Sequence, residues 1–209
     1  MSRVLLASRN AKKLAELQRI LGEQVRVLGL DDVNQFPEEP ETGATFEENA
    51  AAKAVQAARE TGEISLADDS GLSVDALNGM PGVLSARWSG RHGDDPANTA
   101  LLLAQLGDVP DDRRGAAFVC AIALAVPGAA VLVKRADWPG RIVREPIGSN
   151  GFGYDPVFVP RESDVAGDGR TSAELAPAEK DALSHRGRAL ALLLPELTAV
   201  LDRGGNEKG

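Results

Sequence analysis

The opening of the chain sets the strongest limit on its fold, because a short apolar run passes at once into a helical repeat. Val4–Ala7 is apolar and ends at the polar triplet Ser8-Arg9-Asn10. The apolar residues that then recur at helical spacing are Leu14, Leu17, Ile20 and Leu21. A second short apolar run covers residues 25–28. A strand, a tight loop, a helix and another strand in this order are typical of an α/β fold.

The rest of the chain continues the alternation and adds a hairpin. Thr45-Phe46-Glu47-Glu48 is a capping box, which predicts a helix over 45–61. Pro127-Gly128 separates two apolar runs, 116–126 and 131–136, and this predicts a hairpin and therefore a mixed sheet. The other expected elements are strands over 64–67, 72–74 and 157–159, loops over 31–43, 77–93 and 148–155, a helix over 96–106, and helices from 178 onward that Pro195 interrupts.

Composition narrows the class of protein. The 209 residues show no internal repeat or linker, so we expect one domain over 1–203 and a disordered tail over 204–209. The net charge of −8 argues against binding to nucleic acid or to an anionic membrane, which both require a basic surface. A lone cysteine, Cys120, cannot form an internal disulfide, and no apolar run approaches the ~18 residues of a membrane span. We therefore expect a cytoplasmic protein.

Residues 8–13 connect the first strand to the first helix and include two adjacent lysines, Lys12 and Lys13. A loop of this kind presents free backbone amides and the positive end of the helix dipole, which favour a phosphate. Lysines in the first helical turn are unfavourable against the same dipole, so a bound anion would explain them. A solvated helix start is the alternative, and the pattern alone does not decide between the two.

Two adjacent carboxylates, Asp68 and Asp69, directly follow the apolar run 64–67. Carboxylates at the end of a buried strand are costly unless they are paired, hydrogen-bonded or bound to a cation. Because the chain offers oxygen ligands and no His or Cys cluster, the cation would be hard: Mg²⁺, with Mn²⁺ as an alternative. An Asx turn with Gly71 at positive φ is the structural alternative, and it is the commoner interpretation of an isolated motif. The carboxylates of the loop over 31–43 that could add a second metal ligand are Glu38, Glu39 and Glu41.

A second set of candidate residues lies in the C-terminal half. Two glycines flank aromatic residues in Gly151-Phe152-Gly153-Tyr154-Asp155, so backbone and rings can approach a flat ligand closely. Aromatic residues that fill the core would give the same pattern. Further along, Lys180, His185 and Arg186 offer donors that suit a carbonyl-bearing base or a phosphate. A lone histidine is more often a core or capping residue, and that alternative stays open for His185.

Six segments keep their order and a sensible spacing from residue 6 to about 190. They are LASRNAKK at 6–13, ETGATFEENA at 41–50, ADDSGL at 67–72, PG at 81–82 with SAR at 85–87, GFGYDP at 151–156, and SHR at 184–186. Each is weak alone, but together the chain resembles the inosine/xanthosine triphosphate pyrophosphatase family, which acts on non-canonical purine nucleotides. Arg9 departs from this pattern, because the family usually has a glycine there.

This resemblance implies an elongated, two-lobed α/β fold around a central nucleotide-binding cleft, and a homodimer. It also implies Mg²⁺-dependent hydrolysis of ITP, dITP or XTP to the monophosphate and pyrophosphate, which clears these nucleotides from the pool. Asp69 would be the general base and a metal ligand, with Asp68 and Lys13 supporting catalysis. Glu41 would be the second metal ligand. The residues that would bind the triphosphate part of the substrate or lie beside it are Ser8, Arg9, Asn10, Ala11, Lys12, Lys13 and Ser70. The residues that would surround the purine and ribose are Phe152, Gly153, Tyr154, Asp155, Lys180, His185 and Arg186.

Discrimination against ATP would come from donors that face a 6-oxo group, because a 6-amino group would leave them unpaired. Arg186 and the backbone of 152–155 are the candidates for these donors. Two other functions stay open. One is a regulatory protein that binds a nucleotide without catalysis, and the other is a pyrophosphatase that acts on other modified or canonical nucleotides.

Overall fold

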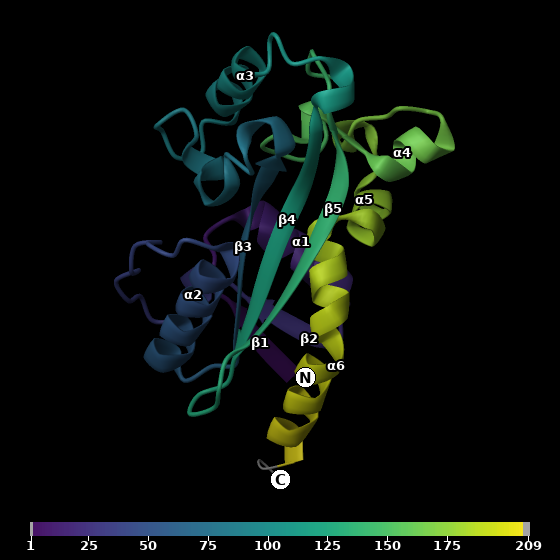
Figure 1. Cartoon of the computed structure of the whole chain (residues 1–209). Helices are drawn as coiled ribbons and strands as arrows, with labels where there is room; N and C mark the ends of the chain where they lie inside the picture. The colour runs from purple at the N-terminus through teal and green to yellow at the C-terminus, as the bar shows by residue number, and fades with distance from the viewer. Residues whose placement is uncertain (1, 207–209) are drawn as a thin grey trace. The chain divides into compact units, whose positions relative to one another are not determined.

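The computed structural model describes the backbone of residues 2–206 and the side chains of residues 2–203 (Figure 1). The strands are β1 (Ser2–Leu6), β2 (Val25–Leu28), β3 (Ser65–Val74), β4 (Gly115–Ala125), β5 (Leu132–Ile142) and β6 (Phe158–Pro160). The α-helices are α1 (Ala11–Leu21), α2 (Phe46–Thr61), α3 (Asp95–Gln105), α4 (Arg161–Ala166), α5 (Pro177–Leu183) and α6 (His185–Asn206). The chain divides into two compact units. The first contains the residues up to Asp69, Cys120–Arg135 and the residues from Arg186 onward, and the second contains Ser70–Val119 and Ala136–His185.

The six strands form one sheet in the order β2-β1-β3-β4-β5-β6. β1 pairs in parallel with β2 and β3, with Val4 opposite Val27, whereas β5 pairs antiparallel with β6. The predicted α/β fold with a mixed sheet is therefore confirmed. The predicted hairpin is present as β4 and β5, two long strands that lie side by side in Figure 1. β5 continues to Ile142, well past the predicted end of this strand.

β3 contains the two adjacent aspartates within its length. The predicted separation of two strands, 64–67 and 72–74, is wrong, because β3 continues unbroken through residues 68–71. Its neighbour β1 ends at Leu6, which pairs with Leu66, and the amide of Ala7 still donates to the carbonyl of Leu66 at 2.7 Å. Past this point β1 no longer pairs with β3. Asp68 and Asp69 therefore follow directly after the last pairing with β1, beside the loop that leaves it.

Helix α2 begins as its sequence predicts. The Thr45 hydroxyl accepts from the amide of Glu48, and the Glu48 carboxylate accepts from the amide of Thr45. This completes the expected capping box. A small core cluster of the first unit joins β1, β2 and α2 through Leu5, Leu28 and Ala57, with Ala7, Val33 and Phe36 packed against it. The acidic loop, residues 31–43, is thus anchored at Val33 and Phe36 by apolar contact.

The second unit has an aromatic core. Phe118 of β4 contacts Phe158 of β6 with ring centroids 4.7 Å apart, and Trp138 of β5 lies 5.5 Å from the same ring. These rings belong to a larger buried cluster that also includes Tyr154 and Leu175. With few aromatic residues in the chain, the second unit concentrates several of them in one place.

Helix α6 differs from the prediction because it continues through Pro195. A proline inside a helix costs about 3 kcal/mol through a lost hydrogen bond and a clash. The residues that stay buried on both sides of it are Ala189, Leu190, Leu193, Leu197 and Leu201. Their helical spacing shows that packing of one apolar face outweighs the local preference. The short helix α4 was not predicted, and α6 extends to Asn206, so of the predicted tail residues 207–209 lie outside the described residues.

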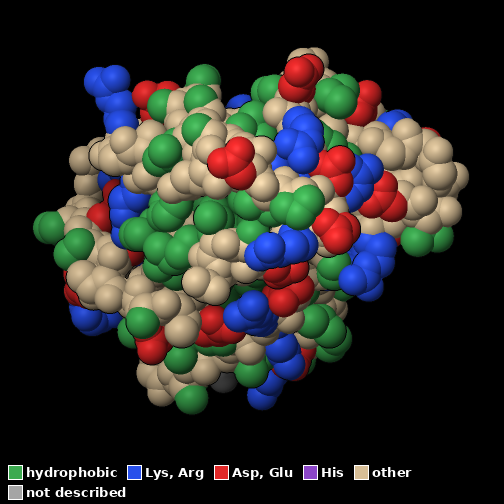
Figure 2. Space-filling model, turned by 45° about the horizontal axis from the view of Figure 1, so that its top comes forward, with side chains coloured by type: hydrophobic (Ala, Val, Ile, Leu, Met, Phe, Trp, Pro, Cys, Tyr) green, Lys and Arg blue, Asp and Glu red, His purple; other side chains and the backbone are tan. Residues whose placement is uncertain are grey.

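Among the described residues, no helix is long and apolar enough to cross a membrane. On the face shown in Figure 2, basic side chains lie next to acidic ones.

Candidate active site

The loop between β1 and α1 is organised by its own polar side chains. The Ser8 hydroxyl accepts from the amide of Asn10 at 3.2 Å. The Asn10 side chain in turn caps α1, accepting from the amides of Lys12 and Lys13 at 3.0 and 3.3 Å. The two lysines are thereby fixed in the first turn of a helix that has no acidic residue there. Residues 8–13 thus form the strand-to-helix loop that the sequence predicts, and we call it the phosphate loop after the ligand that the sequence leads us to expect there.

Asp68 is buried between two cations. Its carboxylate oxygen Oδ2 lies 2.9 Å from the ammonium of Lys13 and 3.2 Å from Nε of Arg186, and its side chain is only 2% exposed. Burial alone would raise the pKa of Asp68. The charges of Lys13 and Arg186, with a contribution from Lys53, outweigh this and hold the pKa well below its usual range. Asp68 is therefore an anion at every pH at which the protein would work.

Arg186, expected from the resemblance to bind the purine, is paired with two carboxylates. Its guanidinium is buried in the first unit, where it pairs with Asp68 and with the carboxylate of Glu16 on α1. Both carboxylates raise the pKa of Arg186 against the effect of burial, so the side chain stays charged. In this arrangement Arg186 holds Asp68, and through it Lys13, while donation from Arg186 to a base stays a prediction.

Asp69 has a different environment from its neighbour. Its Oδ2 accepts a hydrogen bond from the amide of Asn49 at 2.9 Å, and its Oδ1 lies 3.7 Å from the ammonium of Lys53. Burial raises the pKa of Asp69, and the contributions of Lys53 and Asn49 only partly offset this. The two adjacent aspartates therefore have pKa values that are shifted in opposite directions. A pair of carboxylates arranged in this way often marks an acid–base or metal site.

Lys53 lies where three oxygen atoms converge. Its ammonium is 2.9 Å from the carboxylate of Glu41, 2.9 Å from the backbone carbonyl of Asp68 and 3.7 Å from the carboxylate of Asp69. Burial would lower the pKa of Lys53, but these carboxylates raise it above its usual value. The chain thus builds a position that attracts a cation, with ligands of the type that Mg²⁺ prefers.

The sequence interpretation missed Lys53 and Asn49 as site residues, although the sequence contains a signal. Asn49, Lys53 and Gln56 recur at helical spacing on α2, in a segment that is otherwise rich in alanine. Asn49 and Gln56 are buried, and Lys53 is about four-fifths buried. A polar stripe on the buried face of a helix requires partners, and here these partners are the carboxylates and the backbone of the site.

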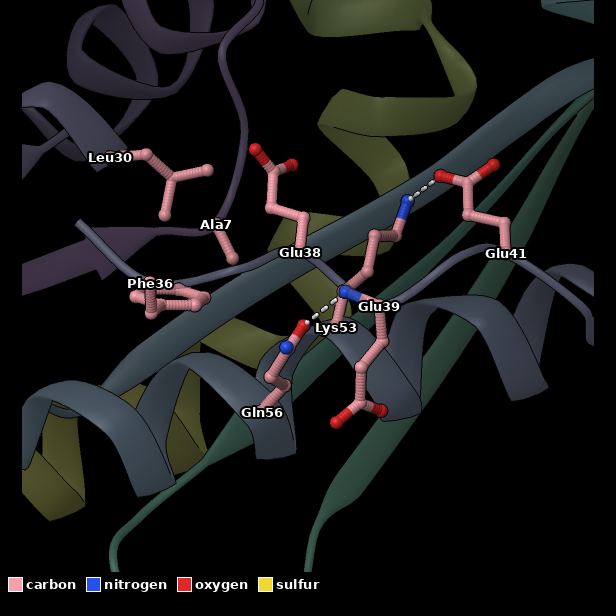
Figure 3. Close-up of a pocket in the computed structure, with 8 residues that line it drawn as sticks. All are labelled: Ala7, Leu30, Phe36, Glu38, Glu39, Glu41, Lys53 and Gln56. Carbon is pink, nitrogen blue, oxygen red and sulfur yellow. Dashed lines mark hydrogen bonds and ion pairs between the residues drawn. The ribbon is translucent and has the colours of Figure 1, made fainter.

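The three glutamates of the acidic loop have different partners. Glu38 pairs with Arg9 of the phosphate loop at 2.5 Å, and Glu39 pairs with Arg59 at 3.0 Å. Glu41 pairs with Lys53 beside Asp69. Figure 3 shows Glu38 and Glu39 pointing to opposite sides of the loop, while Glu41 and Lys53 point toward one another. Of the three, Glu41 is therefore the one that meets the aspartates.

A divalent ion fits this set of residues only if the substrate contributes ligands. Among the described residues, no group of three or more His, Cys, Asp or Glu side chains could hold a metal ion. Asp69 and Glu41 supply two carboxylates. Mg²⁺ in proteins is commonly held by one or two carboxylates and completes its shell with water and phosphate oxygens. The residues present therefore fit a Mg²⁺ ion that binds together with a phosphate ligand.

In the second unit, Asp155 organises the loop over 151–155. Its carboxylate accepts from the amide of Phe152 at 2.8 Å, from the hydroxyl of Ser172 at 2.8 Å and from the ammonium of Lys180 at 2.5 Å. Gly151 at φ +77° allows this close approach, because a Cβ there would lie 2.0 Å from a carboxylate oxygen of Asp155. Asp155 is itself buried, so it shapes the loop rather than reaching out toward a ligand.

The aromatic residues of this unit divide into core and candidate binding groups. Tyr154 is buried in the core cluster and its hydroxyl donates to the carbonyl of Ser85 at 2.9 Å, so its ring fills the core, which the sequence left open as the alternative; contact of this ring with a base stays a prediction. Phe152 is only partly buried, and the ammonium of Lys180 lies 5.4 Å from its ring centroid. His185 is buried and stacks on Phe118 with centroids 4.9 Å apart, as the core interpretation allowed.

Two backbone amides of the same loop already donate hydrogen bonds within the protein. The amide of Gly153 donates to Asp95 at 2.8 Å, and the amide of Phe152 donates to Asp155. Neither amide is therefore a simple candidate for the donor to a 6-oxo group. Ser70 follows Asp69 in β3 and is partly exposed.

Comparisons with known proteins agree with these motifs. The model of the Ham1 family matches residues 4–196. A dITP/XTP pyrophosphatase of Nocardia farcinica is 66% identical over 207 residues, which cover 97% of this chain and 98% of that protein. A dITP/XTP pyrophosphatase of Mycobacterium tuberculosis is 64% identical over 203 residues, which cover 95% of this chain and 97% of that protein.

Solved structures give the same result. The structure of a nucleoside-triphosphatase, or dITP/XTP pyrophosphatase, from Mycobacterium abscessus has 63% identity and a TM-score of 0.75, and the match covers 92% of this chain and 99% of that chain. The structure of the Ham1 protein from Staphylococcus aureus has 37% identity and a TM-score of 0.83, and covers 95% of this chain and 99% of that chain. The resemblance inferred from the six segments is thus confirmed, and the chain belongs to the Ham1 family.

Proposed function

We propose that this chain is a Mg²⁺-dependent pyrophosphatase that hydrolyses dITP, ITP and XTP to the nucleoside monophosphate and pyrophosphate, and so removes these nucleotides from the pool. Relatives that match nearly its whole length are named dITP/XTP pyrophosphatases. The observation that carries the proposal is the pair of adjacent aspartates, of which one is held as an anion beside Lys13 while the other has a raised pKa beside Glu41 and Lys53.

The phosphate loop supplies the positive charge for a triphosphate. Lys13 has a partly exposed ammonium, 17% exposed on its side chain, and Asp68 holds it in place at 2.9 Å. Lys12 extends from the same turn and is exposed. A phosphate oxygen would replace Asp68 as the nearest anion of Lys13. Positioning and charge neutralisation of this kind are the main requirements of phosphoryl transfer.

Asp69 would act as the general base toward the attacking water. Asn49 fixes the orientation of the Asp69 carboxylate through Oδ2, so that its other oxygen is placed to accept a proton from water. Asp69 and Glu41 would also hold the Mg²⁺ ion, which supplies charge neutralisation for the phosphates when it is bound. Water attack at the α-phosphorus in line with the leaving pyrophosphate would then give the monophosphate in one step.

From the family resemblance, Phe152 and Lys180 would recognise the purine. Phe152 offers a partly exposed ring for stacking, and Lys180 offers an ammonium that Asp155 holds beside this ring. Lys180 is therefore the donor that we assign to the 6-oxo group of hypoxanthine or xanthine. An adenine amino group in the same place would leave the ammonium without an acceptor, which disfavours ATP.

We also propose, from the family resemblance, that the protein is a homodimer in the cytoplasm. Light scattering coupled to gel filtration measures the mass of the assembly directly. A mass of one chain, 21.9 kDa, at micromolar concentration would contradict the dimer.

A substrate panel tests the proposed activity. The panel measures pyrophosphate release from dITP, ITP, XTP, ATP and GTP in the presence of Mg²⁺ and in EDTA, for the wild type and Asp69→Asn. We expect turnover of the first three, little turnover of ATP because of its 6-amino group, and loss of activity in EDTA and in the variant. Little turnover of GTP, which also carries a 6-oxo group, is expected from the family resemblance alone. Tight binding of dITP without turnover in Mg²⁺ or Mn²⁺ would favour the regulatory protein, whereas equal turnover of ATP would remove the specificity.

A further inference from the structure

Arg9 of the phosphate loop extends toward the acidic loop. Its Nε lies 2.5 Å from the carboxylate of Glu38 and its Nη1 lies 3.2 Å from the carboxylate of Asp31. The pair with Glu38 raises the pKa of Arg9, so the side chain remains charged. One planar guanidinium thus contacts two carboxylates that are seven positions apart in the sequence, on either side of the apolar anchor Phe36.

The acidic loop needs such contacts because it has little regular structure. After the short turn of 3-10 helix at Leu30–Asp32, residues 33–45 form neither helix nor strand. Further along, the acidic loop is held by α2. The Gln56 side chain accepts from the amide of Glu39 at 3.1 Å and donates to the carbonyl of Pro37 at 2.7 Å. Glu39 itself pairs with Arg59 of α2.

Glu38 differs from its neighbours in the element that holds it. Glu39 and Glu41 both pair with cations of α2, whereas Glu38 pairs with the phosphate loop. In Figure 3 the side chain of Glu38 accordingly points away from α2. The bond to Arg9 therefore connects the loop that would hold the triphosphate to the loop that presents Glu41.

We propose that Arg9 is a positioning residue that acts through Glu38 and Asp31 to hold the acidic loop, and with it Glu41, in place for the metal ion. This inference rests on the proposed function in so far as Glu41 serves the metal. The competing role is a direct contact between Arg9 and a phosphate of the substrate. In that case Glu38 would compete with the substrate for the guanidinium.

The two roles predict opposite effects of Glu38→Gln. If Arg9 acts through Glu38, then Arg9→Gln and Glu38→Gln each raise the Mg²⁺ concentration that gives half-maximal activity. The double variant is then no worse than either single variant. The expected rise is about two- to fivefold, because the three side chains are about half or more exposed and such pairs are individually weak. At saturating Mg²⁺ the KM for dITP stays within about twofold of the wild type.

Two further variants test whether the position and the shape of the Arg9 guanidinium matter. Arg59→Gln removes an arginine that is 59% exposed, against 49% for Arg9, and that also pairs with an acidic-loop glutamate, but it leaves the phosphate loop untouched. We expect this variant to show the wild-type Mg²⁺ dependence. Arg9→Lys keeps the charge but cannot contact both carboxylates through a planar fork, so it restores only part of the effect.

Amide hydrogen exchange of the metal-free and nucleotide-free protein gives a readout that does not depend on activity. We expect amides of residues 33–41 to exchange faster in Arg9→Gln and in Glu38→Gln than in the wild type or in Arg59→Gln. Unchanged exchange in both variants would overturn the inference.

The kinetic outcomes also decide the matter. Additive effects of the two substitutions, or a lower KM for dITP in Glu38→Gln with a higher KM in Arg9→Gln, would overturn the inference in favour of a phosphate contact. If the wild type hydrolyses no nucleotide, the proposed function fails. The exchange experiment still tests how Arg9 holds the loop.

Discussion

Replacing each of the two adjacent aspartates by asparagine is expected to change stability in opposite directions. Asp68→Asn removes the anion between two cations whose side chains are 5% and 17% exposed, Arg186 and Lys13. Removing one partner of a buried ion pair costs about 3–5 kcal/mol when the other charge stays buried. Here Lys13 loses its anion at 2.9 Å, and Arg186 keeps only its pair with Glu16. For a chain of this length the loss corresponds to a Tm that is about 6–20 °C lower.

Asp69→Asn removes a carboxylate that the fold destabilises. Because the folded-state pKa of Asp69 is raised above the unfolded value of about 3.9, its ionised form costs stability at neutral pH, and the cost is relieved as pH falls through the folded-state pKa. The asparagine keeps an oxygen that can accept from Asn49. We expect the unfolding free energy of this variant to equal or exceed that of the wild type, by less than about 1 kcal/mol, while activity is lost.

Asp68 shows the reverse pH dependence. Its folded-state pKa is depressed, so its stabilising effect is fully present above the unfolded value of about 3.9 and is lost as pH falls below it toward the folded-state pKa. The difference between wild type and Asp68→Asn should therefore be constant from about pH 5 to 8 and shrink in acid.

The assay is urea unfolding followed by circular dichroism, in EDTA so that no divalent ion contributes. Glu63→Gln is a matched control, since its pair with Arg3 is exposed and is worth about 1 kcal/mol or less. The reasoning is refuted if both aspartate variants lose the same free energy, or if Asp68→Asn loses no more than the control.

Three further predictions concern residues whose contacts are known only from the structure. Tyr154→Phe removes the buried hydrogen bond to Ser85 and should lower the unfolding free energy by about 1–2 kcal/mol, with the KM for dITP unchanged. A large rise in KM would instead indicate that Tyr154 binds the substrate. Gly151→Ala places a Cβ 2.0 Å from a carboxylate oxygen of Asp155 at φ +77°, so we expect a loss of about 2 kcal/mol or more and a higher KM, measured by urea unfolding and steady-state kinetics. Lys53→Met leaves the oxygens of Glu41 and Asp68 without their cation and should lower the Tm in EDTA. Added Mg²⁺ should restore part of the lost Tm, and a Tm that Mg²⁺ does not change would contradict this.

Local sequence patterns predicted much of the fold because the elements obey local rules. The strand over 25–28 and the capped start of α2 are where the sequence places them. The errors have tertiary causes. Asp68 and Asp69 look like a loop because two carboxylates disfavour a buried strand, yet Lys13, Lys53 and Arg186 compensate their charge from distant segments.

The candidate site was predicted in its outline but not in its partners. The motif pattern correctly brought the phosphate loop and the aspartates together, since Lys13 contacts Asp68. It could not show that Arg186 pairs with Asp68, because that contact joins residues 118 positions apart. Glu41 as the second metal ligand stays a prediction; the sequence contains no local difference between Glu41 and Glu38, whereas the structure pairs Glu41 with Lys53 and Glu38 with Arg9.

Hydrolysis in ¹⁸O-labelled water tests the central claim most directly, because the label shows which phosphorus water attacks. The wild-type protein with dITP and Mg²⁺ should incorporate one ¹⁸O atom into dIMP and none into pyrophosphate, as mass spectrometry of the separated products would show. Label in pyrophosphate, or release of labelled orthophosphate with a nucleoside diphosphate, would contradict attack at the α-phosphorus and the roles assigned to Lys13 and Asp69.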